Sequence, residues 1–428
     1  MKNSRIIGFH KLDLSERRAI IREALGSAEI EDLDSLLDSG GLDSKRALSI
    51  VENVIGIYSL PFGVAMNFTI NGKDRLVPMV VEEPSVIAAS SNAAKMVRQG
   101  GGFHAQMEES LIVAQVELRS VRDIAAARQA IADDTEEVLR VAREAVPGLV
   151  RRGGGPKRLT IRELAPDHLV VHIAVDACDA MGANLANMVA EATGPLLARL
   201  AQAEVGLRIL SNLSDERLVR VKAKIPFEAL HKDAELGASA ARAIEAASIF
   251  AERDPYRATT HNKGIMNGVD SVLLATGNDY RAVEAGAHAF AAKSGRYLPL
   301  ATWRTREDGL FGSLEMPISV GVVGGTLRVH HAARFSLRLA EIESARDLAM
   351  LAGAAGLASN LAALRALSME GILRGHMALH ARSLASFVGA EPDEVEAVAA
   401  RITFGNDFSE LAARAALVAE REARQRST

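Results

Sequence analysis

The order of strand and helix patterns over residues 110–214 constrains the fold of this chain more than any other feature of its sequence. Residues 110–119 alternate between apolar and polar side chains, as half-buried strands do, and the apolar spacing then changes to that of a helix. The complete order is β-α-β-β-α-β, which predicts a ferredoxin-like domain. The predicted strands cover residues 110–119, 157–163, 168–176 and 205–210, and the predicted helices cover residues 121–142 and 181–201.

The rest of the chain predicts a larger domain into which this one is inserted. At roughly 150 residues for a domain, the chain is long enough for two or three of them. Helical patterns dominate after residue 214, and mixed structure returns around residues 296–329. We therefore expect an α+β fold. Its parts are a large helix-rich domain from residues 1–109 and 215–373, an inserted domain from residues 110–214, and a small C-terminal helical unit from residues 374–428.

The first segment carries several local predictions. Asn71-Gly72-Lys73-Asp74 is a hairpin-turn signal between strand-like runs. The expected elements are a polar helix near residues 15–25, strands over residues 54–57 and 64–70, and a helix that ends near residue 98 before three glycines.

The composition excludes several classes of protein. Hydrophobic residues are 48% and charged residues 24% of the chain, which is ordinary for a globular protein and excludes a disordered one. The net charge of −4 argues against a broad nucleic-acid-binding surface, and the single Cys178 excludes an internal disulfide. Leu348–Leu364 lacks charged residues, but its glycines, serine and asparagine favour a buried, tightly packed helix pair over a membrane span. We expect a cytoplasmic protein without nucleic acid or membrane as a partner.

A polar run from Thr259 to Gly268 lies where a helix should be apolar. Lys263 and Asn267 are four residues apart, so a helix places them on one face. An ammonium and a carboxamide that point together into a cleft would stabilise a developing oxyanion. The simpler interpretation of this pair alone is a surface lysine beside a solvated asparagine.

Two acidic residues are further candidates, each with an ordinary structural alternative. Asp279 either caps the helix that follows it or, if buried near Lys263, holds that lysine charged. Glu83 precedes a predicted helix, where an acid complements the helix dipole. If Glu83 were buried and carried a proton near neutral pH, it would instead serve as a general acid.

His376 and His380 form a His-x-x-x-His pair on a predicted helix. The glutamate of the metalloprotease motif is absent, so a proton-transferring histidine is a better hypothesis than zinc. The segment from Asp176 to Asn184 follows a strand and begins a helix, where backbone N–H groups attract phosphate and Gly182 allows close approach. This spacing is not the Rossmann fingerprint, so the motif does not identify a dinucleotide by itself.

Six segments share a pattern that no single motif carries. They are Glu52-Asn53-Val54-Ile55-Gly56, residues 82–89, Asp179–Asn184, His261–Gly268, Thr276–Asp279 and Gly375-His376-Met377. Together they resemble 3-hydroxy-3-methylglutaryl-CoA (HMG-CoA) reductase, in particular the soluble bacterial class II type and its degradative, NADH-using members. The likeness follows the chain in order over nearly its whole length.

The resemblance implies a reaction and a role for each catalytic candidate. The enzyme would interconvert HMG-CoA and mevalonate plus CoA through two hydride transfers, with Lys263 polarising the thioester carbonyl and stabilising the hemithioacetal oxyanion. Glu83 would supply the proton when mevaldehyde is reduced. Asp279 would hydrogen-bond Lys263 and help Glu83 to hold its proton, and His376 would protonate the departing CoA thiolate.

The resemblance also implies binding residues and an architecture. Ser85, Arg257 and Asn267 match positions that hold the HMG group, and a guanidinium suits its carboxylate because it binds bidentately. The large domain would bind HMG-CoA, the inserted domain the cofactor, and the C-terminal unit would close as a flap. A homodimer with sites at its interface, possible higher assembly, NADH as cofactor and no metal are implied. The implied cofactor-binding residues are Asp179, Met181, Gly182, Asn184 and Asn212.

One position departs from the family pattern. NADH-specific relatives place an aspartate late in the first helix of the small domain, where this chain has Val146. A carboxylate there would repel a 2′-phosphate, so its absence makes NADPH an alternative, with Arg143, Arg151 or Arg152 to accommodate it. We favour NADH and mevalonate catabolism. The alternatives are a biosynthetic NADPH-using reductase and a non-enzymatic, ferredoxin-like regulatory or RNA-binding protein, although the predicted strands 110–119 and 168–176 carry no aromatic residue.

Overall fold

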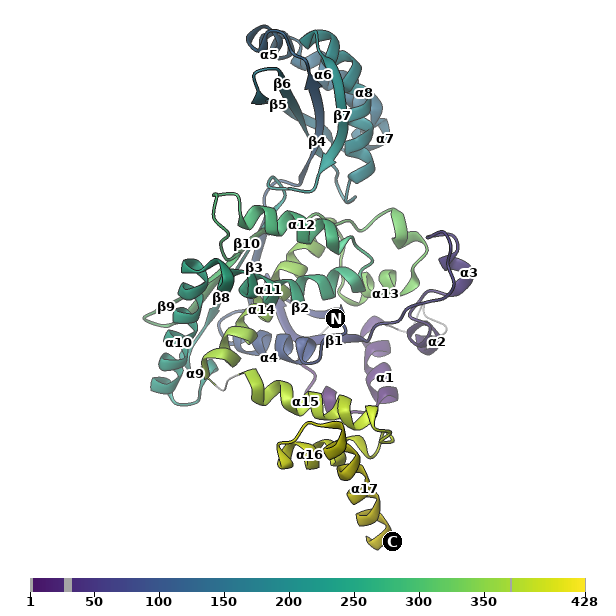
Figure 1. Ribbon diagram of the computed structural model, residues 1–428, viewed down its shortest axis with the longest axis vertical. Coiled ribbons are helices and arrows are strands. Elements are labelled where there is room, and N and C mark those ends of the chain that lie inside the picture. The colour runs from purple at the N-terminus through teal and green to yellow at the C-terminus, as the bar shows by residue number, and fades with distance from the viewer. Residues whose placement is uncertain (1–2, 27–32, 370–371, 428) are drawn as a thin grey trace.

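The computed structural model describes residues 3–26, 33–369 and 372–427, except for the side chains of residues 326, 372–379, 426 and 427. Figure 1 shows three parts along the long axis: a small α/β unit, a larger central part, and a helical part that carries the C-terminus. The chain leaves the central part once, forms the small unit, and returns to the same sheet. The fold is therefore of the mixed α+β class, as predicted.

The central part is built on a six-stranded sheet of order β2-β1-β3-β8-β10-β9. Strand β3, which precedes the small unit in the chain, pairs antiparallel with β8, which follows it. All neighbouring strands are antiparallel except β1 and β3. The strands are β1 (Phe62–Ile70), β2 (Lys73–Val80), β3 (Phe103–Met107), β8 (Leu218–Ile225), β9 (Ala301–Arg306) and β10 (Gly309–Pro317).

The β1–β2 hairpin confirms the turn predicted at Asn71-Gly72. Ile70 pairs with Lys73, so the loop has two residues, and both have positive φ, 49° at Asn71 and 77° at Gly72. Such a turn matches the twist of the flanking strands, which is why Asn-Gly favours it. The hairpin delivers the chain from β2 directly to Glu83 and its neighbours.

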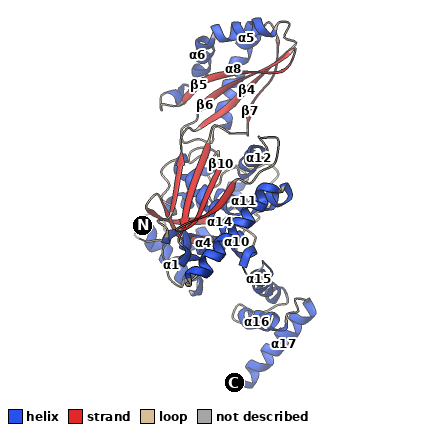
Figure 2. Ribbon diagram, turned by 90° about the vertical axis from the view of Figure 1, so that its left-hand side faces the viewer, coloured by secondary structure: helices blue, strands red, loops and turns tan. Residues whose placement is uncertain are grey.

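Long helices pack beside this sheet (Figure 2). Among them, α14 is a single buried helix of 25 residues rather than the helix pair expected from Leu348–Leu364. It is the one described helix long and apolar enough to cross a membrane, but 78% of its apolar window is buried inside the molecule, against α11, α10 and α4. The long helices are α4 (Val86–Gln99), α10 (Ala234–Arg253), α11 (Pro255–Ala275), α12 (Tyr280–Ala291) and α14 (Ala345–Met369), and the short α9 (Phe227–Leu230) contacts α10.

The close packing of α11 on α14 depends on a glycine. A Cβ atom added at Gly268 would lie 2.3 Å from the carbonyl oxygen of Ala355, which is a severe clash. Only glycine lets the two backbones approach so closely. The packing fixes which face of α11 is buried and leaves the face with Lys263 and Asn267 turned away from the core.

The small unit follows the predicted β-α-β-β-α-β order. Its sheet has the order β5-β6-β4-β7, and every neighbouring pair is antiparallel. An apolar core lies between this sheet and its helices. The elements are β4 (Leu111–Arg119), α5 (Ile124–Asp133), α6 (Thr135–Ala145), α7 (Pro147–Val150), β5 (Gly155–Ala165), β6 (His168–Asp176), α8 (Ala183–Ala201) and β7 (Glu204–Ser211).

Two local predictions were wrong. The helix expected over residues 121–142 is two helices, because the chain breaks at Asp134 between α5 and α6. The segment Val54–Ile57 forms no strand, and the side chain of Ile55 is fully exposed. β-branched residues favour strands only where a neighbouring strand is present to pair with them, and none is adjacent here in the described part of the chain.

Short elements at the start of the chain pack beside β1 and β2. Ile21, Leu33, Phe335 and Leu339 form a separate apolar cluster with Leu76 of β2. The elements of this region are η1 (Phe9–Lys11), α1 (Leu14–Leu25), α2 (Leu33–Asp38), α3 (Ser44–Ala47), η2 (Gly325–Arg328) and α13 (His331–Leu339).

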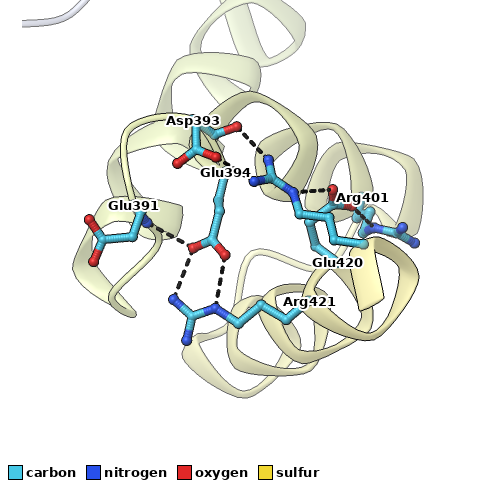
Figure 3. Close-up of polar contacts among 7 residues, drawn as sticks. Glu391, Asp393, Glu394, Arg401, Glu420 and Arg421 are labelled. Atoms are coloured by element: carbon cyan, nitrogen blue, oxygen red, sulfur yellow. Dashed lines mark hydrogen bonds and ion pairs between the residues drawn. The ribbon is translucent and has the colours of Figure 1, made fainter. Parts of the chain in front are cut away.

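The C-terminal helices α15 (Ile372–Phe387), α16 (Val395–Gly405) and α17 (Glu410–Ser427) form a unit with its own apolar core. Polar contacts reinforce it (Figure 3). Glu394 accepts hydrogen bonds from the Arg421 guanidinium at 2.9 Å and from the Glu391 backbone N–H at 2.9 Å. These donors lower the pKa of Glu394 to about 2.

Candidate active site

Glu83 and Lys263 form the centre of the site. Nζ of Lys263 lies 2.5 Å from Oε2 of Glu83. Lys263 stands in the middle of α11, and Glu83 lies in the turn between β2 and α4. The side chain of Lys263 is 60% exposed and that of Glu83 is 34% exposed, so a substrate can approach the pair from solvent. The structure therefore confirms that Lys263 lies on an open face of α11, while its catalytic role stays a prediction.

Asn267 joins this pair from one turn further along α11. Its Nδ2 donates to the same Oε2 of Glu83 at 3.4 Å. Glu83 thus accepts hydrogen bonds from an ammonium and a carboxamide on one face of α11. An ammonium that is already positioned can meet negative charge that develops on a substrate oxygen, because the protein has paid for its orientation in advance.

Ser85 adopts a backbone conformation that suggests function. It occupies the N-cap position of α4, yet its side chain makes no cap hydrogen bond, and its φ is 76°. Serine favours an N-cap because its hydroxyl accepts from the helix N–H groups, and it rarely adopts positive φ. A residue held in this region points to a role outside local structure. The hydroxyl of Ser85 makes no hydrogen bond within the described part of the chain.

Arg257 lies in the first turn of α11, half-buried. Its guanidinium has no hydrogen-bond or ion-pair partner among residues 3–26, 33–369 and 372–427, and burial lowers its pKa. Together with burial, its charge lowers the pKa of the neighbouring His261 to about 4. An arginine without a counter-ion is suited to the carboxylate of a ligand. Lys263 lies six positions further along the chain, which is about 9 Å along a helix axis.

Asp279 takes the structural role that the sequence left open. Its Oδ1 accepts from the backbone N–H of Ala282 at 3.2 Å and so caps α12. The same oxygen lies 3.5 Å from Nε of Arg281. Among the described residues, Asp279 makes no hydrogen bond or ion pair with Lys263. The expected Asp279–Lys263 hydrogen bond therefore stays a prediction.

A cleft of about 460 Å³ lies between the small unit and the central part, and several of the predicted cofactor-binding residues line it. Asp279 lines it together with Met181, Gly182 and Asn184. Gly182, with φ of 101°, is the N-cap of α8, so the N-terminal turn of this 19-residue helix borders the cleft. Backbone N–H groups there favour an anion. The lining residues lie within segments 180–185, 277–281 and 321–327.

Asp179 and Asn212 lie outside the lining of this cleft. Oδ1 of Asp179 accepts from the backbone N–H of Ala345 at 2.9 Å, where α14 begins. Asn212 is exposed and follows β7, and its carbonyl oxygen accepts from the backbone N–H of Ser214 at 2.9 Å. The structure thus gives Asp179 a role in joining the small unit to α14, while its role toward a cofactor stays a prediction.

His376 belongs to α15, and its side chain lies outside the described residues. His380, one turn later, is exposed and packs edge-on against Phe408, with ring centroids 6.2 Å apart. Among the described residues, no three His, Cys, Asp or Glu side chains gather closely enough to hold a metal ion. Proton transfer by His376 stays a prediction, because its side chain lies outside the described residues.

The structure also reveals polar groups that the sequence did not single out. Asp270 follows Asn267 by one turn of α11, and burial together with Glu284 of α12 raises its pKa to about 8. A charged residue within the apolar run from Val269 to Ala275 was the available signal. Arg217 is fully buried between β7 and β8, and nothing in its sequence context distinguishes it from a surface arginine.

Comparisons with known proteins identify a family that this chain resembles over most of its length. A model of the hydroxymethylglutaryl-coenzyme A reductase family matches residues 13–381. The 3-hydroxy-3-methylglutaryl-coenzyme A reductase of Archaeoglobus fulgidus is 45% identical over 400 residues, which cover 92% of this chain and 90% of that protein. A probable reductase of the same name from Borreliella burgdorferi is 37% identical over 339 residues, covering 78% of this chain and 77% of that one.

Solved structures give the same result. The reductase from Streptococcus pneumoniae superposes with a TM-score of 0.83 at 40% identity, covering 96% of this chain and 98% of that chain. A structure of the class II enzyme from the same organism, bound to NADPH in open conformations, superposes with a TM-score of 0.82 at 41% identity, covering 84% of this chain and 99% of that chain.

Proposed function

The chain belongs to the hydroxymethylglutaryl-coenzyme A reductase family, and on that premise we propose that it interconverts HMG-CoA and mevalonate plus CoA with a nicotinamide cofactor. The single observation that carries the proposal is the contact of Lys263 with Glu83, reinforced by Asn267. Reduction of a thioester to an alcohol needs a cation for the oxyanion and a proton source for the alkoxide. These three side chains supply both at one place.

The proposed roles follow from this geometry. Lys263 would bind the thioester carbonyl oxygen and stabilise the hemithioacetal oxyanion, and Glu83, already within reach, would protonate the oxygen when mevaldehyde is reduced. Ser85 and Arg257, whose polar groups have no side-chain partner among the described residues, would hold the HMG group together with Asn267. His376 would protonate the thiolate of the departing CoA. Asp279 would support Lys263 and Glu83.

The cofactor supplies or accepts hydride when bound. The residues that fit it are those at the start of α8, because the N-terminal turn of a long helix borders the cleft and Gly182 leaves room for close approach. Helix α11 connects this cleft with Lys263, since it ends two residues before Gly277. Met181, Gly182 and Asn184, which line the cleft, would bind the cofactor. Asp179 and Asn212, which lie outside that lining, complete the proposed set of cofactor-binding residues.

For the cofactor we keep NADH as the prediction from the sequence, and one observation favours NADPH as the second candidate. Val146 is buried in the core of the small unit, so no carboxylate at that position faces a ribose. Arg152 is exposed, and its carbonyl oxygen lies 3.9 Å from Sγ of Cys178, immediately before the cleft segment. The relative from Streptococcus pneumoniae was solved with NADPH.

The domain boundaries extend the proposal. We assign HMG-CoA binding to residues 1–109 and 215–373, which share one sheet, and cofactor binding to the ferredoxin-like residues 110–214, whose order and antiparallel pairing support that topology. Residues 374–428 would close as a flap, which the separate core of α15, α16 and α17 supports. We also propose a homodimer, supported by the exposed apolar side chains of Val51, Ile55 and Tyr58. Cytoplasmic location and a catabolic role stay predictions.

The test is turnover. Addition of HMG-CoA with NADH or NADPH should decrease the absorbance of the reduced nicotinamide, and mevalonate, CoA and the oxidised cofactor should raise it. Comparison of NADH and NADPH at equal concentrations decides the preference. Absence of turnover with both cofactors, in both directions, would contradict the proposal.

A further inference from the structure

Arg217 occupies an exceptional position at the junction of the small unit and the central part. It precedes β8, where the chain returns from the small unit, and its side chain is fully buried. Its guanidinium donates four hydrogen bonds, and its Nε has no partner in the described part of the chain. The acceptors are the carbonyl oxygens of Met181 at 2.8 Å, Ala180 at 3.3 Å and Val320 at 2.8 Å, and Oγ of Ser319 at 3.2 Å.

These acceptors belong to two different walls of the cleft. Ala180 and Met181 form the start of the α8 wall, while Val320 immediately precedes Gly321 on the opposite wall. The two walls touch backbone to backbone, because a Cβ atom added at Gly321 would lie 2.4 Å from the backbone nitrogen of Met181. The planar guanidinium of Arg217 therefore fixes the distance between the start of α8 and the segment of Val320.

The third wall is tied to the same frame. The backbone N–H of Gly321 donates to Oδ1 of Asn278 at 2.8 Å, and Asn278 directly precedes Asp279. A continuous path thus leads from Met181 through Arg217, Val320 and Gly321 to the turn that holds Asp279.

The charge of Arg217 needs an explanation, because a buried cation without an ion-pair partner is costly. Among the described residues, no carboxylate lies within ion-pair distance of it. Burial lowers its pKa to about 10, while the more distant Asp176 and Asp179 favour the charged form, so the guanidinium stays protonated at neutral pH. An apolar side chain of similar size would fill the space but would leave four acceptors without donors.

We propose that Arg217 is a positioning residue for the cofactor: it fixes the peptide carbonyls of Ala180 and Met181 against the segment of Val320, and so aligns the start of α8 with the turn of Asp279. This inference rests on the proposed function. We assign Arg217 no direct contact with HMG-CoA, because its side chain is fully buried and its four hydrogen bonds go to protein acceptors.

The experiment compares Arg217→Met and Arg217→Lys with Arg220→Met as a matched control. Arg220 lies on β8 three residues later and pairs with Glu315 and Glu108, away from the cleft. Binding of NADH and NADPH is followed by nucleotide fluorescence without HMG-CoA, and the KM for HMG-CoA and kcat are measured separately. Hydrogen exchange of the peptide that contains residues 179–185 reports the order of the α8 wall.

We expect cofactor affinity to fall by about tenfold or more in Arg217→Met, because hydrogen bonds from a charged donor are lost. Arg217→Lys should lose less cofactor affinity, since an ammonium keeps the positive charge but cannot reproduce the planar set of guanidinium donors. Exchange at 179–185 should rise in both variants, the KM for HMG-CoA should change much less than cofactor affinity, and Arg220→Met should bind the cofactor as the wild type does.

Two results would overturn the inference: wild-type cofactor affinity in Arg217→Met, or equal losses of affinity for cofactor and HMG-CoA, which would indicate general structural damage. If Arg217→Met does not fold, Arg217→Lys decides, and wild-type cofactor affinity in that variant counts against the proposal. Failure of the wild type to bind either nucleotide would instead contradict the proposed function.

Discussion

The Nζ atom of Lys263 lies 2.5 Å from Oε2 of Glu83, although 180 positions of the chain separate the two residues. One residue is held by a helix that packs on the core through Gly268, and the other by a turn at the end of a hairpin strand. Two rigid elements therefore set the distance between an ammonium and a carboxyl group. Preorganisation of this kind is the main means by which proteins stabilise an oxyanion.

Lys263→Ala should abolish most of the activity while the fold remains. We expect a loss of kcat of at least about 10²-fold, because the donor to the developing oxyanion disappears. The side chain is 60% exposed, and exposed ion pairs contribute little to stability, so the thermal unfolding midpoint should change little. Turnover and circular dichroism melting check both statements. Lys224→Ala, which removes an ion pair with Asp308 instead, is the control. Wild-type turnover in Lys263→Ala would exclude the oxyanion role.

His376→Gln should separate the two half-reactions. Thioester reduction releases a thiolate that needs a proton, whereas reduction of free mevaldehyde releases no thiolate. Mevaldehyde reduction should therefore survive better than thioester reduction. Rates with HMG-CoA and with mevaldehyde give the ratio directly. His380→Gln, on the same helix and packed against Phe408, should leave that ratio unchanged. Equal losses of both activities in His376→Gln would argue against thiolate protonation.

Asp270 makes the stability of the folded chain depend on pH. Burial and Glu284 raise its pKa in the folded state to about 8, from an ordinary value of 3.8. Between these values the folded chain holds a proton that the unfolded chain releases. The contribution of Asp270 to stability is therefore complete below about pH 3.8 and declines as the pH rises toward about 8.

The variant Asp270→Asn tests this statement, because an amide does not ionise. Urea midpoints measured from acid to mildly alkaline pH should fall less steeply with pH in the variant than in the wild type. Glu235→Gln, at the exposed start of α10, serves as a carboxylate control and should keep the wild-type slope. Parallel curves for Asp270→Asn and the wild type would show that Asp270 is ionised in the folded chain at neutral pH.

Glu394 should protect the C-terminal unit against acid. Its donors, Arg421 and the Glu391 N–H, lower its pKa to about 2, so its stabilising contribution is present above its ordinary value of 4.5 and is lost as the pH falls through about 2. Hydrogen exchange of α16 and α17 should be faster in Glu394→Gln than in the wild type at neutral pH. The difference should shrink below about pH 4.5 as the wild type takes up its proton. Glu396→Gln, whose partner is Arg382, is the control, and equal protection in Glu394→Gln and the wild type at neutral pH would refute the prediction.

Features that depend on neighbours along the chain were predictable. The Asn71-Gly72 hairpin was predicted because the positive φ of both residues is a local preference, and the start of α8 because Gly182 and the preceding strand mark it. Lys263 and Asn267 share a face because the helical repeat requires it. The strand expected at Val54–Ile57 failed for the opposite reason, since strand pairing needs a partner that local residues do not provide.

The sequence by itself therefore determined the α+β class, the order of the strands of the small unit and the polar face of α11. The tertiary structure alone decided that Glu83 meets Lys263 and that Arg217 becomes a buried link between two walls of a cleft. The physical reason is the range of the forces involved. Helical periodicity and turn preferences act between residues a few positions apart, whereas burial and hydrogen bonding of Arg217 depend on segments that only the packed chain brings together.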